Sequence, residues 1–313
     1  DLGRHIKLDT KSVSGLADAR LRFAFPLINS LTLDQVDFAA SADLEGVGVA
    51  DIAAGQALSD ATLKLELNRD SLRIDGTGMV AGTQATLTME EVFTKDARIR
   101  TRKHLIGVFD EAVLKDLGLP SFAVLEGPVT VDVKAHELAD GRSELMAVVD
   151  LKDARLALPA LKWAKPAKAA GRVRFSLEML DGRIRRLKSA SLVAADLGLD
   201  MTATFAADTG ALENARFDRL VLAKSTMTGT LIVADSGLIE ITMSGDRLDI
   251  QRFLEDEATD FQPAAKRTGG PISINAHFDE VLIAALPPIT NAVMNLRDNG
   301  VRLAYIQLNG QIG

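Results

Sequence analysis

The chain contains no cysteine among its 313 residues. This absence excludes a disulfide framework, a thiolate metal site and a cysteine nucleophile. Aromatic residues make up only 4% of the chain, with one tryptophan and one tyrosine, so its apolar mass is mostly aliphatic. No run of about 18 consecutive apolar residues is present, so the sequence predicts no transmembrane helix. The net charge of −7 argues against a general nucleic-acid-binding protein.

Strict alternation of apolar and polar residues is abundant instead. In "TLKLELN", Leu63, Leu65 and Leu67 fall on one face of an extended chain, and the polar residues between them fall on the other. "GRVRFSLEML", "VTVDVKA" and "ISINAHF" show the same pattern. Alternation with a period of two is typical of antiparallel strands that have one buried face and one solvated face.

Turn-forming residues separate these strands. Gly, Asn and Asp tolerate the positive φ that tight hairpins need. We predict hairpin turns at Asn68–Ser71, Asp140–Gly141, Asp181–Gly182, Asp208–Gly210, Asp235–Gly237 and Asp298–Gly300. The predicted fold class is therefore all-β with few short helices: long antiparallel strands in a meander that forms an elongated, curved groove or an open-barrel-like sheet.

Only two segments favour a helix. "LIGVFDEAVLKDLGLP" at 105–120 predicts one, ended by Gly118 and Pro120, and "RLDIQRFLEDEA" at 247–258 predicts another. Two short helices are too few to cover the apolar face of a sheet built from this many strands.

A weak internal repeat organises the chain. "ASADLEGVGVADIA" resembles "AVVDLKDARLALPA", and an alternating strand follows each of them. We predict one elongated, repeat-built segment over 1–313, with repeats over about 36–135 and 143–250 and a further unit starting in 251–313. Both ends of the sequence read as cut, so we expect a segment of a longer protein whose targeting signals lie elsewhere.

The aliphatic face of such a sheet can be kept from water in three ways. It packs on a second sheet, closes inside a barrel, or curls into a groove that holds an apolar ligand. Filled sandwiches are often rich in aromatic bulk, whereas small and branched side chains fit a curved wall around acyl chains. We predict as lipid-facing residues Leu63, Leu65, Leu67, Leu72, Ile74, Val173, Phe175, Leu177, Met179, Ile272 and Ile274.

The only tryptophan, Trp163, stands in the basic stretch "LKWAKPAKAAG", which we predict to be a loop because Pro166 interrupts a strand. Tryptophan favours membrane–water boundaries, and lysines attract anionic headgroups. We therefore predict Trp163, Lys162 and Lys165 as rim or headgroup contacts, with a partly exposed indole. The alternative is that Trp163 is a buried packing residue and the lysines are the solvated side of the loop.

Two longer stretches resemble a known family. An "SDATL" strand followed by "LRIDGTGMVAG", and the loop "LPALKWAKPAKAAG", resemble the AsmA-like proteins of Gram-negative envelopes, in particular the YhdP/TamB branch. The resemblance extends over most of the chain. It implies a periplasmic protein, anchored to the inner membrane, whose repeating β-groove carries phospholipid or another acyl lipid between the inner and outer membranes, with envelope proteins as candidate partners. It implies no catalytic residues.

The titratable residues form no pattern typical of catalysis or metal binding. The four histidines make no HxxxH or HExxH pair and lie far apart in sequence, at His5, His104, His136 and His277. Acidic pairs such as Glu90–Glu91 are typical of solvated turns or helix ends. We predict a protein that is not an enzyme and has no metal site, no cofactor and no nucleic-acid partner. A structural β-scaffold with a filled interior is the alternative to lipid transfer, and a hydrolase comes third.

Overall fold

A computed structural model describes residues 13–30, 32, 35–53, 56–110, 113, 124–251, 270–283, 286–300 and 303–312. Of these residues, 75% lie in strands and 2% in helices, which confirms the predicted all-β fold. The chain divides into two compact units. Unit 1 comprises Asp1–Pro120 and Pro128–Val149, and unit 2 comprises Ser121–Gly127 and Asp150–Gly313. The predicted repeat boundaries stay a prediction.

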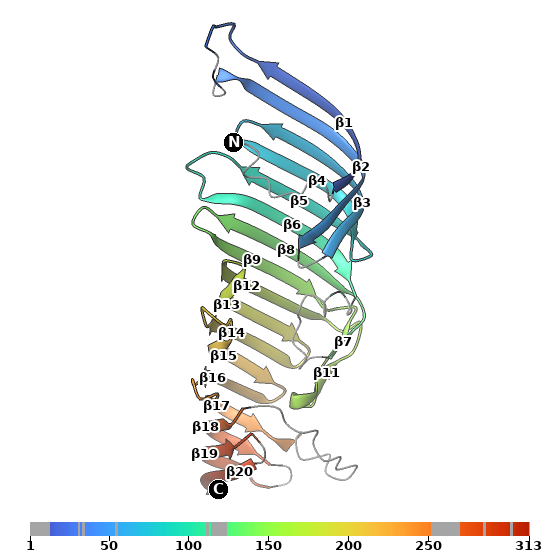
Figure 1. Ribbon diagram of the computed structural model, residues 1–313. Helices are drawn as coiled ribbons and strands as arrows, with labels where there is room; N and C mark the ends of the chain where they lie inside the picture. The colour runs from blue at the N-terminus through green and yellow to red at the C-terminus, as the bar shows by residue number, and fades with distance from the viewer. Residues whose placement is uncertain are drawn as a thin grey trace. The chain divides into compact units, whose positions relative to one another are not determined.

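Unit 1 contains one sheet whose strands follow one another in sequence order (Figure 1). Its strands are β1 (Val13–Ala24), β2 (Asp37–Ala53), β3 (Gln56–Asn68), β4 (Ser71–Val80), β5 (Thr83–Val92), β6 (Ile99–Phe109), β8 (Val129–Leu138) and β9 (Arg142–Asp150). From β1 to β8, each strand pairs antiparallel with the next strand of this sheet. The meander predicted from the hairpin signals is thus confirmed for this unit.

The strands of the main sheet of unit 2 also pair in sequence order, and all but one of the pairings are antiparallel. Its main sheet consists of β12 (Gly171–Leu180), β13 (Arg183–Ala194), β14 (Leu197–Phe205), β15 (Leu212–Leu222), β16 (Ser225–Val233), β17 (Ile239–Asp249), β18 (Ile272–Leu282), β19 (Ile289–Asp298) and β20 (Leu303–Ile312). Neighbours pair antiparallel, except that β17 and β18 pair parallel. Parallel neighbours need a crossover, and most of the residues between these two strands lie outside the described part of the chain.

A second, small sheet belongs to unit 2. It consists of β7 (Val124–Glu126), β10 (Arg155–Leu158) and β11 (Trp163–Lys165), with β10 in the middle and both pairings antiparallel. A short 3-10 turn, η4 (Pro159–Leu161), joins β10 to β11. The stretch predicted to be a loop around Trp163 therefore contains a strand, which ends at Lys165, directly before Pro166.

The predicted hairpin turns are confirmed, and others were missed. At the turn between β3 and β4, the Asn68 Oδ1 atom accepts hydrogen bonds from the N–H groups of Asp70 and Ser71, at 2.8 and 2.9 Å. The missed turns contain Ala195 and Ala223, which adopt φ values of 50° and 52°. Alanine rarely adopts positive φ, so its presence in a sequence gives no turn signal.

Both helix predictions are wrong at their first residues, although Val113 and Gln251, which fall within the predicted helices, are helical. Strand β6 extends to Phe109, so residues 105–109 are not helical. Ile106 and Val108 point to the opposite face from Leu105 and are partly exposed. Apolar residues therefore occur on both faces of this strand, and that distribution resembles the pattern of a helix. In the second segment, 247–249 belong to β17. Nearly all the remaining residues of both predicted helices lie outside the described residues.

Small residues form a row across β3, β4, β5 and β6. Gly78 lies opposite Ala85, and Ala85 lies opposite Gly107. A Cβ atom on Gly78 would lie 2.7 Å from the Cβ atom of Ala61, and one on Gly107 would lie 2.8 Å from Cζ of Phe109. Cβ atoms on neighbouring strands are normally about 5 Å apart. Only small side chains therefore fit at this row, where the Phe109 ring covers Gly107 and the register of β3 is irregular between Ser59 and Thr62.

Candidate functional site: the inner face of each sheet

The strand register gathers the predicted apolar residues of unit 1 on one face. Leu65 on β3 lies opposite Ile74 on β4, which lies opposite Met89 on β5. Leu67 lies opposite Leu72 in the same way. Side chains of directly opposed residues share a face. We call this face, which also carries the row of small residues, the inner face of unit 1.

The inner face of unit 2 is apolar from its first strand to its last. One row of opposed residues runs from β12 to β16 through Val173, Leu192, Leu199, Leu220 and Met227. A second row runs from β16 to β20 through Leu231, Ile241, Ile274, Leu296 and Ile306. Of these ten residues, only Val173 and Ile274 are among the predicted lipid-facing residues. The intervening strands carry the same alternation, which is the signal that would have found the others.

Each inner face is packed at one end of its strands and more open at the other. In unit 1, Leu58 and Leu63 are buried, whereas Leu65 and Leu67 further along β3 are half-buried. In unit 2, a buried cluster of Met227, Ala276, Phe278, Val281 and Ala292 fills the end where β18 finishes, and Ile272 and Ile274 at its start are half-buried. Of the residues predicted to face lipid, only Leu63 and Leu72 are buried, and the rest are half-buried.

The opposite, outer face is polar. Arg219 and Asp200 form an ion pair at 2.8 Å, and Arg247 and Glu280 form another at 2.6 Å. The hydrogen bond from Arg219 holds the pKa of the Asp200 carboxyl below its usual value. Such exposed pairs contribute little to stability because water screens them. The outer faces are therefore charged and hydroxylated. The inner faces are mostly aliphatic, although Lys103, opposite Met89 in unit 1, forms an ion pair with Glu137 at 2.9 Å.

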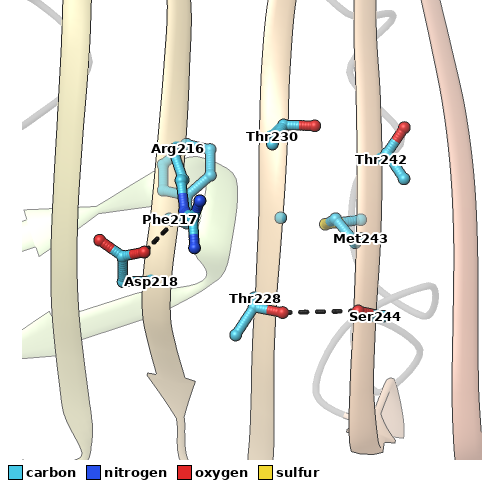
Figure 2. A pocket seen from close by; sticks show the side chains of 9 residues that line it. Arg216, Phe217, Asp218, Thr228, Thr230, Thr242, Met243 and Ser244 are labelled. Atoms are coloured by element: carbon cyan, nitrogen blue, oxygen red, sulfur yellow. Dashed lines mark hydrogen bonds and ion pairs between the residues drawn. The ribbon is translucent and has the colours of Figure 1, made fainter.

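A shallow hollow of about 310 Å³ crosses β15, β16 and β17 (Figure 2). Its lining consists of Arg216, Phe217, Asp218, Thr228, Gly229, Thr230, Thr242, Met243 and Ser244. The Oγ1 atom of Thr228 and the Oγ atom of Ser244 lie 3.4 Å apart, and Arg216 pairs with Asp218 at 2.7 Å. None of the nine is a histidine or a lysine, and the one carboxylate is paired, so no base is placed to activate these hydroxyls.

The titratable groups offer no metal centre in the part of the chain that the structure describes. No group of three or more His, Asp and Glu side chains there is arranged to hold a metal ion. His104 lies 2.8 Å from the carboxylate of Asp132 as a partly exposed pair. His5 lies outside the described residues. The inner face is therefore the feature on which a functional proposal rests best.

The prediction of a partly exposed Trp163 is wrong. The side chain is only 4% exposed, and its indole Nε1–H donates a hydrogen bond of 2.7 Å to Oδ1 of Asp196, in the turn between β13 and β14. The small sheet is thus fixed to the main sheet of unit 2 by a buried aromatic ring whose polar atom is paired. A rim position for Trp163 would need an accessible ring.

Lys165 is not a headgroup contact either. It is fully buried, and its Nζ donates hydrogen bonds to the carbonyl oxygens of Ala154, Pro166 and Ala169, at 2.7, 2.9 and 2.9 Å. A Cβ atom on Gly171 would lie 2.9 Å from Cδ of Lys165, so the lysine stem packs directly on the start of β12. Lys162, by contrast, is exposed and adopts a φ of 44° at the end of η4.

Tryptophan fluorescence checks this placement, because Trp163 is the only tryptophan of the chain. We expect blue-shifted emission that acrylamide quenches several-fold less than after unfolding in urea, since the ring is out of reach of water. Adding anionic vesicles should leave the emission unchanged. A further blue shift on adding vesicles would contradict the buried position and restore the rim interpretation.

No helix among the described residues is long and apolar enough to cross a membrane. No family model matches the chain, and neither a curated protein nor a solved structure matches it. Its function therefore has to be argued from the geometry of the two inner faces.

Proposed function

We propose that the inner faces hold the acyl chains of a lipid while its headgroup stays in water. The single observation that carries this proposal is the half-buried state of apolar residues on each inner face, among them Leu65 and Ile74 in unit 1 and Phe175 and Leu177 in unit 2. In this proposal the chain is a segment of a periplasmic lipid-transfer protein, anchored to the inner membrane, that supports phospholipid transport between the inner and outer membranes. The resemblance to AsmA-like proteins supports the location.

The energetics favour a flexible apolar ligand. Each methylene group buried contributes about 0.8 kcal/mol, so an acyl chain gains binding energy in proportion to the length of wall that it covers. Leu, Ile, Val and Met side chains offer such a wall without fixed polar contacts, and a lipid can slide from one row to the next at similar energy. Moving a lipid along such a path breaks no covalent bond, so the protein needs no catalytic residues and no cofactor.

A structural scaffold with a filled interior is the second candidate. The buried cluster around Phe278, which is 0% exposed, favours it, because that end of the inner face in unit 2 is already packed by the protein itself. Under this alternative the half-buried residues would be the margin of a core, and the outer face would dock partners.

Lipid analysis of the purified protein separates the two functions. We expect organic extraction followed by mass spectrometry to recover acyl lipids in amounts comparable with the protein on a molar basis, and native mass spectrometry to show the corresponding added mass. Protein that is folded and free of lipid after mild purification, and that takes up none from vesicles, would favour the filled scaffold instead.

A further inference from the structure

Arg185 on β13 has buried nitrogen atoms without a hydrogen-bond partner. Its Nε and Nη1 atoms are shielded from water, and no described residue accepts a hydrogen bond from either of them. No other side chain in the described part of the chain has such atoms. Buried polar groups in folded proteins are nearly always paired, because an unpaired group has lost its water without a replacement. Arg185 therefore lacks a partner that the described residues do not supply.

The register of β13 places Arg185 on the inner face of unit 2. Leu187 lies opposite Leu177 on this face. Ile184 lies opposite Met179 on the same face, although residues three apart face opposite sides of a regular strand. The register shifts between these two pairs and leaves Arg185 opposite no residue of β12, and such bulges re-aim a side chain. Because Arg185 lies two residues from Leu187, its side chain shares the inner face.

Apolar side chains surround Arg185 on this face. Ile184, the preceding residue, lies opposite Met179. On the other side, the pairing of β13 with β14 brings Arg185 beside Phe205, the last residue of β14. None of these three side chains carries a negative charge or a strong hydrogen-bond acceptor. A cation in such surroundings is unfavourable unless an anion neutralises it.

The position of Arg185 leaves it within reach of a ligand. The residue as a whole is half-buried, so part of its side chain reaches the surface. The start of β13, where Arg185 lies, is at the same end of the sheet as the starts of β17 and β18. There Ile272 and Ile274 are half-buried, away from the packed cluster around Phe278. Arg185 thus stands at the more open end of the inner face.

We propose that Arg185 binds the anionic group, a phosphate or a carboxylate, of an acyl lipid whose chains lie on the inner face of unit 2. This inference rests on the lipid binding proposed above. The N–H groups of arginine match the oxygen atoms of phosphates and carboxylates, and hydrogen bonds between opposite charges are the strong ones. An oxygen atom of the headgroup supplies the missing partner, while the rest of the headgroup stays in water.

Native mass spectrometry of the full chain, freed of lipid, tests this site with two lipids that have the same acyl chains. Dioctanoylphosphatidylglycerol carries a phosphate, and dioctanoylglycerol is uncharged. We expect the unchanged protein to bind the phospholipid more tightly. Arg185→Met should weaken phospholipid binding about tenfold and leave binding of the uncharged lipid as it is, because methionine keeps an apolar stem and removes the charge.

Competition identifies the source of the anion. Displacement of the phospholipid by octanoate, but not by inorganic phosphate at the same concentration, would support a headgroup site that also accepts carboxylates. Displacement by neither would support a site specific for the phospholipid. Displacement by inorganic phosphate alone would show an ion site that needs no acyl chain, and would overturn the headgroup site.

Arg186→Met is the matched control. Arg186 lies exposed on the outer face of β13, opposite Glu178, so this variant loses the same charge from the same strand. It should bind both lipids like the unchanged protein. Without lipid, Arg185→Met should unfold at the same or a higher urea concentration than the unchanged protein, because it removes an unpaired buried charge. Lower stability with unchanged phospholipid binding would make Arg185 a structural residue and overturn the site.

The two proposals fail in different ways. Equal binding of both lipids, with no loss in Arg185→Met, would overturn the headgroup site and leave lipid binding on the inner face in place. Binding of neither lipid by the folded, unchanged protein would overturn both.

Discussion

Replacing Leu65 by Asp is expected to leave the protein folded and to lower its bound lipid at least about tenfold. Leu65 is half-buried in the middle of the inner-face row of unit 1, between Ala42 on β2 and Ile74 on β4. With no lipid present, water reaches a carboxylate at this position, so folding is little affected. With an acyl chain present, the carboxylate would have to lose that water, and the contact becomes unfavourable.

The control for Leu65→Asp is Thr86→Asp. Thr86 is exposed on the outer face of β5, opposite Thr77 and Ile106, so it adds the same charge to the same sheet without touching the inner face. Lipid content should stay at the level of the unchanged protein. If Leu65→Asp unfolds the protein, the position is part of a filled core, because an unpaired buried charge costs several kcal/mol. A folded Leu65→Asp variant with unchanged lipid would remove Leu65 from the lipid path.

Replacing Lys165 by Met is expected to lower the free energy of unfolding by about 3 kcal/mol. Methionine keeps the length of the stem beside Gly171 but removes all three N–H donors. The carbonyl oxygens of Ala154, Pro166 and Ala169 then lose their partner. Urea unfolding followed by Trp163 fluorescence reports on this change, since Trp163 lies on the same strand, β11.

Lys168→Met is the matched control. The Lys168 Nζ atom lies 2.6 Å from the carboxylate of Asp153, but both side chains are largely exposed. An exposed pair contributes little, so the unfolding midpoint should hardly move. Equal effects of the two substitutions would contradict a specific structural role for Lys165.

The free energies of unfolding of the unchanged protein and of Lys165→Met should depend on pH in different ways, and the sign of the difference can be derived. Desolvation lowers the pKa of Lys165 from its ordinary value of 10.5, while the charges of Asp150 and Asp153 oppose this shift. Between the lowered pKa and 10.5, the unfolded chain binds one proton more than the folded chain, so stability rises with pH in that window. The stability difference between the unchanged protein and Lys165→Met should therefore widen as pH rises toward 10.5. If this stability difference narrowed with rising pH, the carbonyl and carboxylate groups around Lys165 would have to raise its pKa by more than desolvation lowers it.

Local alternation predicted the strands and their faces because it needs no knowledge of distant residues. Leu63, Leu65 and Leu67 share a face in any extended strand, and the register then only has to align them with β4. The parallel pairing of β17 with β18 had no such local signal, since it depends on a crossover. The turns at Ala195 and Ala223 were missed because alanine rarely adopts positive φ, so the residue type gives no turn signal.

The predicted exposure of Trp163 and Lys165 was wrong for a related reason. Lysines beside a proline suggest a solvated loop, and nothing in the sequence reveals that Lys165 meets a carbonyl 11 residues away or that Trp163 meets a carboxylate 33 residues away. A buried lysine is rare unless every N–H finds an acceptor, so composition alone argues for exposure. Only the fold of β10, η4 and β11 brings those acceptors together.

Site-specific photocrosslinking along β3 tests lipid binding on the inner face most directly. A benzophenone side chain is placed in turn at Lys64, Leu65, Glu66 and Leu67, the protein is irradiated in the cells that produce it, and adducts are identified by mass spectrometry. Lipid adducts at Leu65 and Leu67, and none at Lys64 and Glu66, are the predicted result, because consecutive residues of a strand face opposite sides. Adducts that show no such alternation, or no lipid adduct at Leu65 and Leu67 in folded protein, would contradict it.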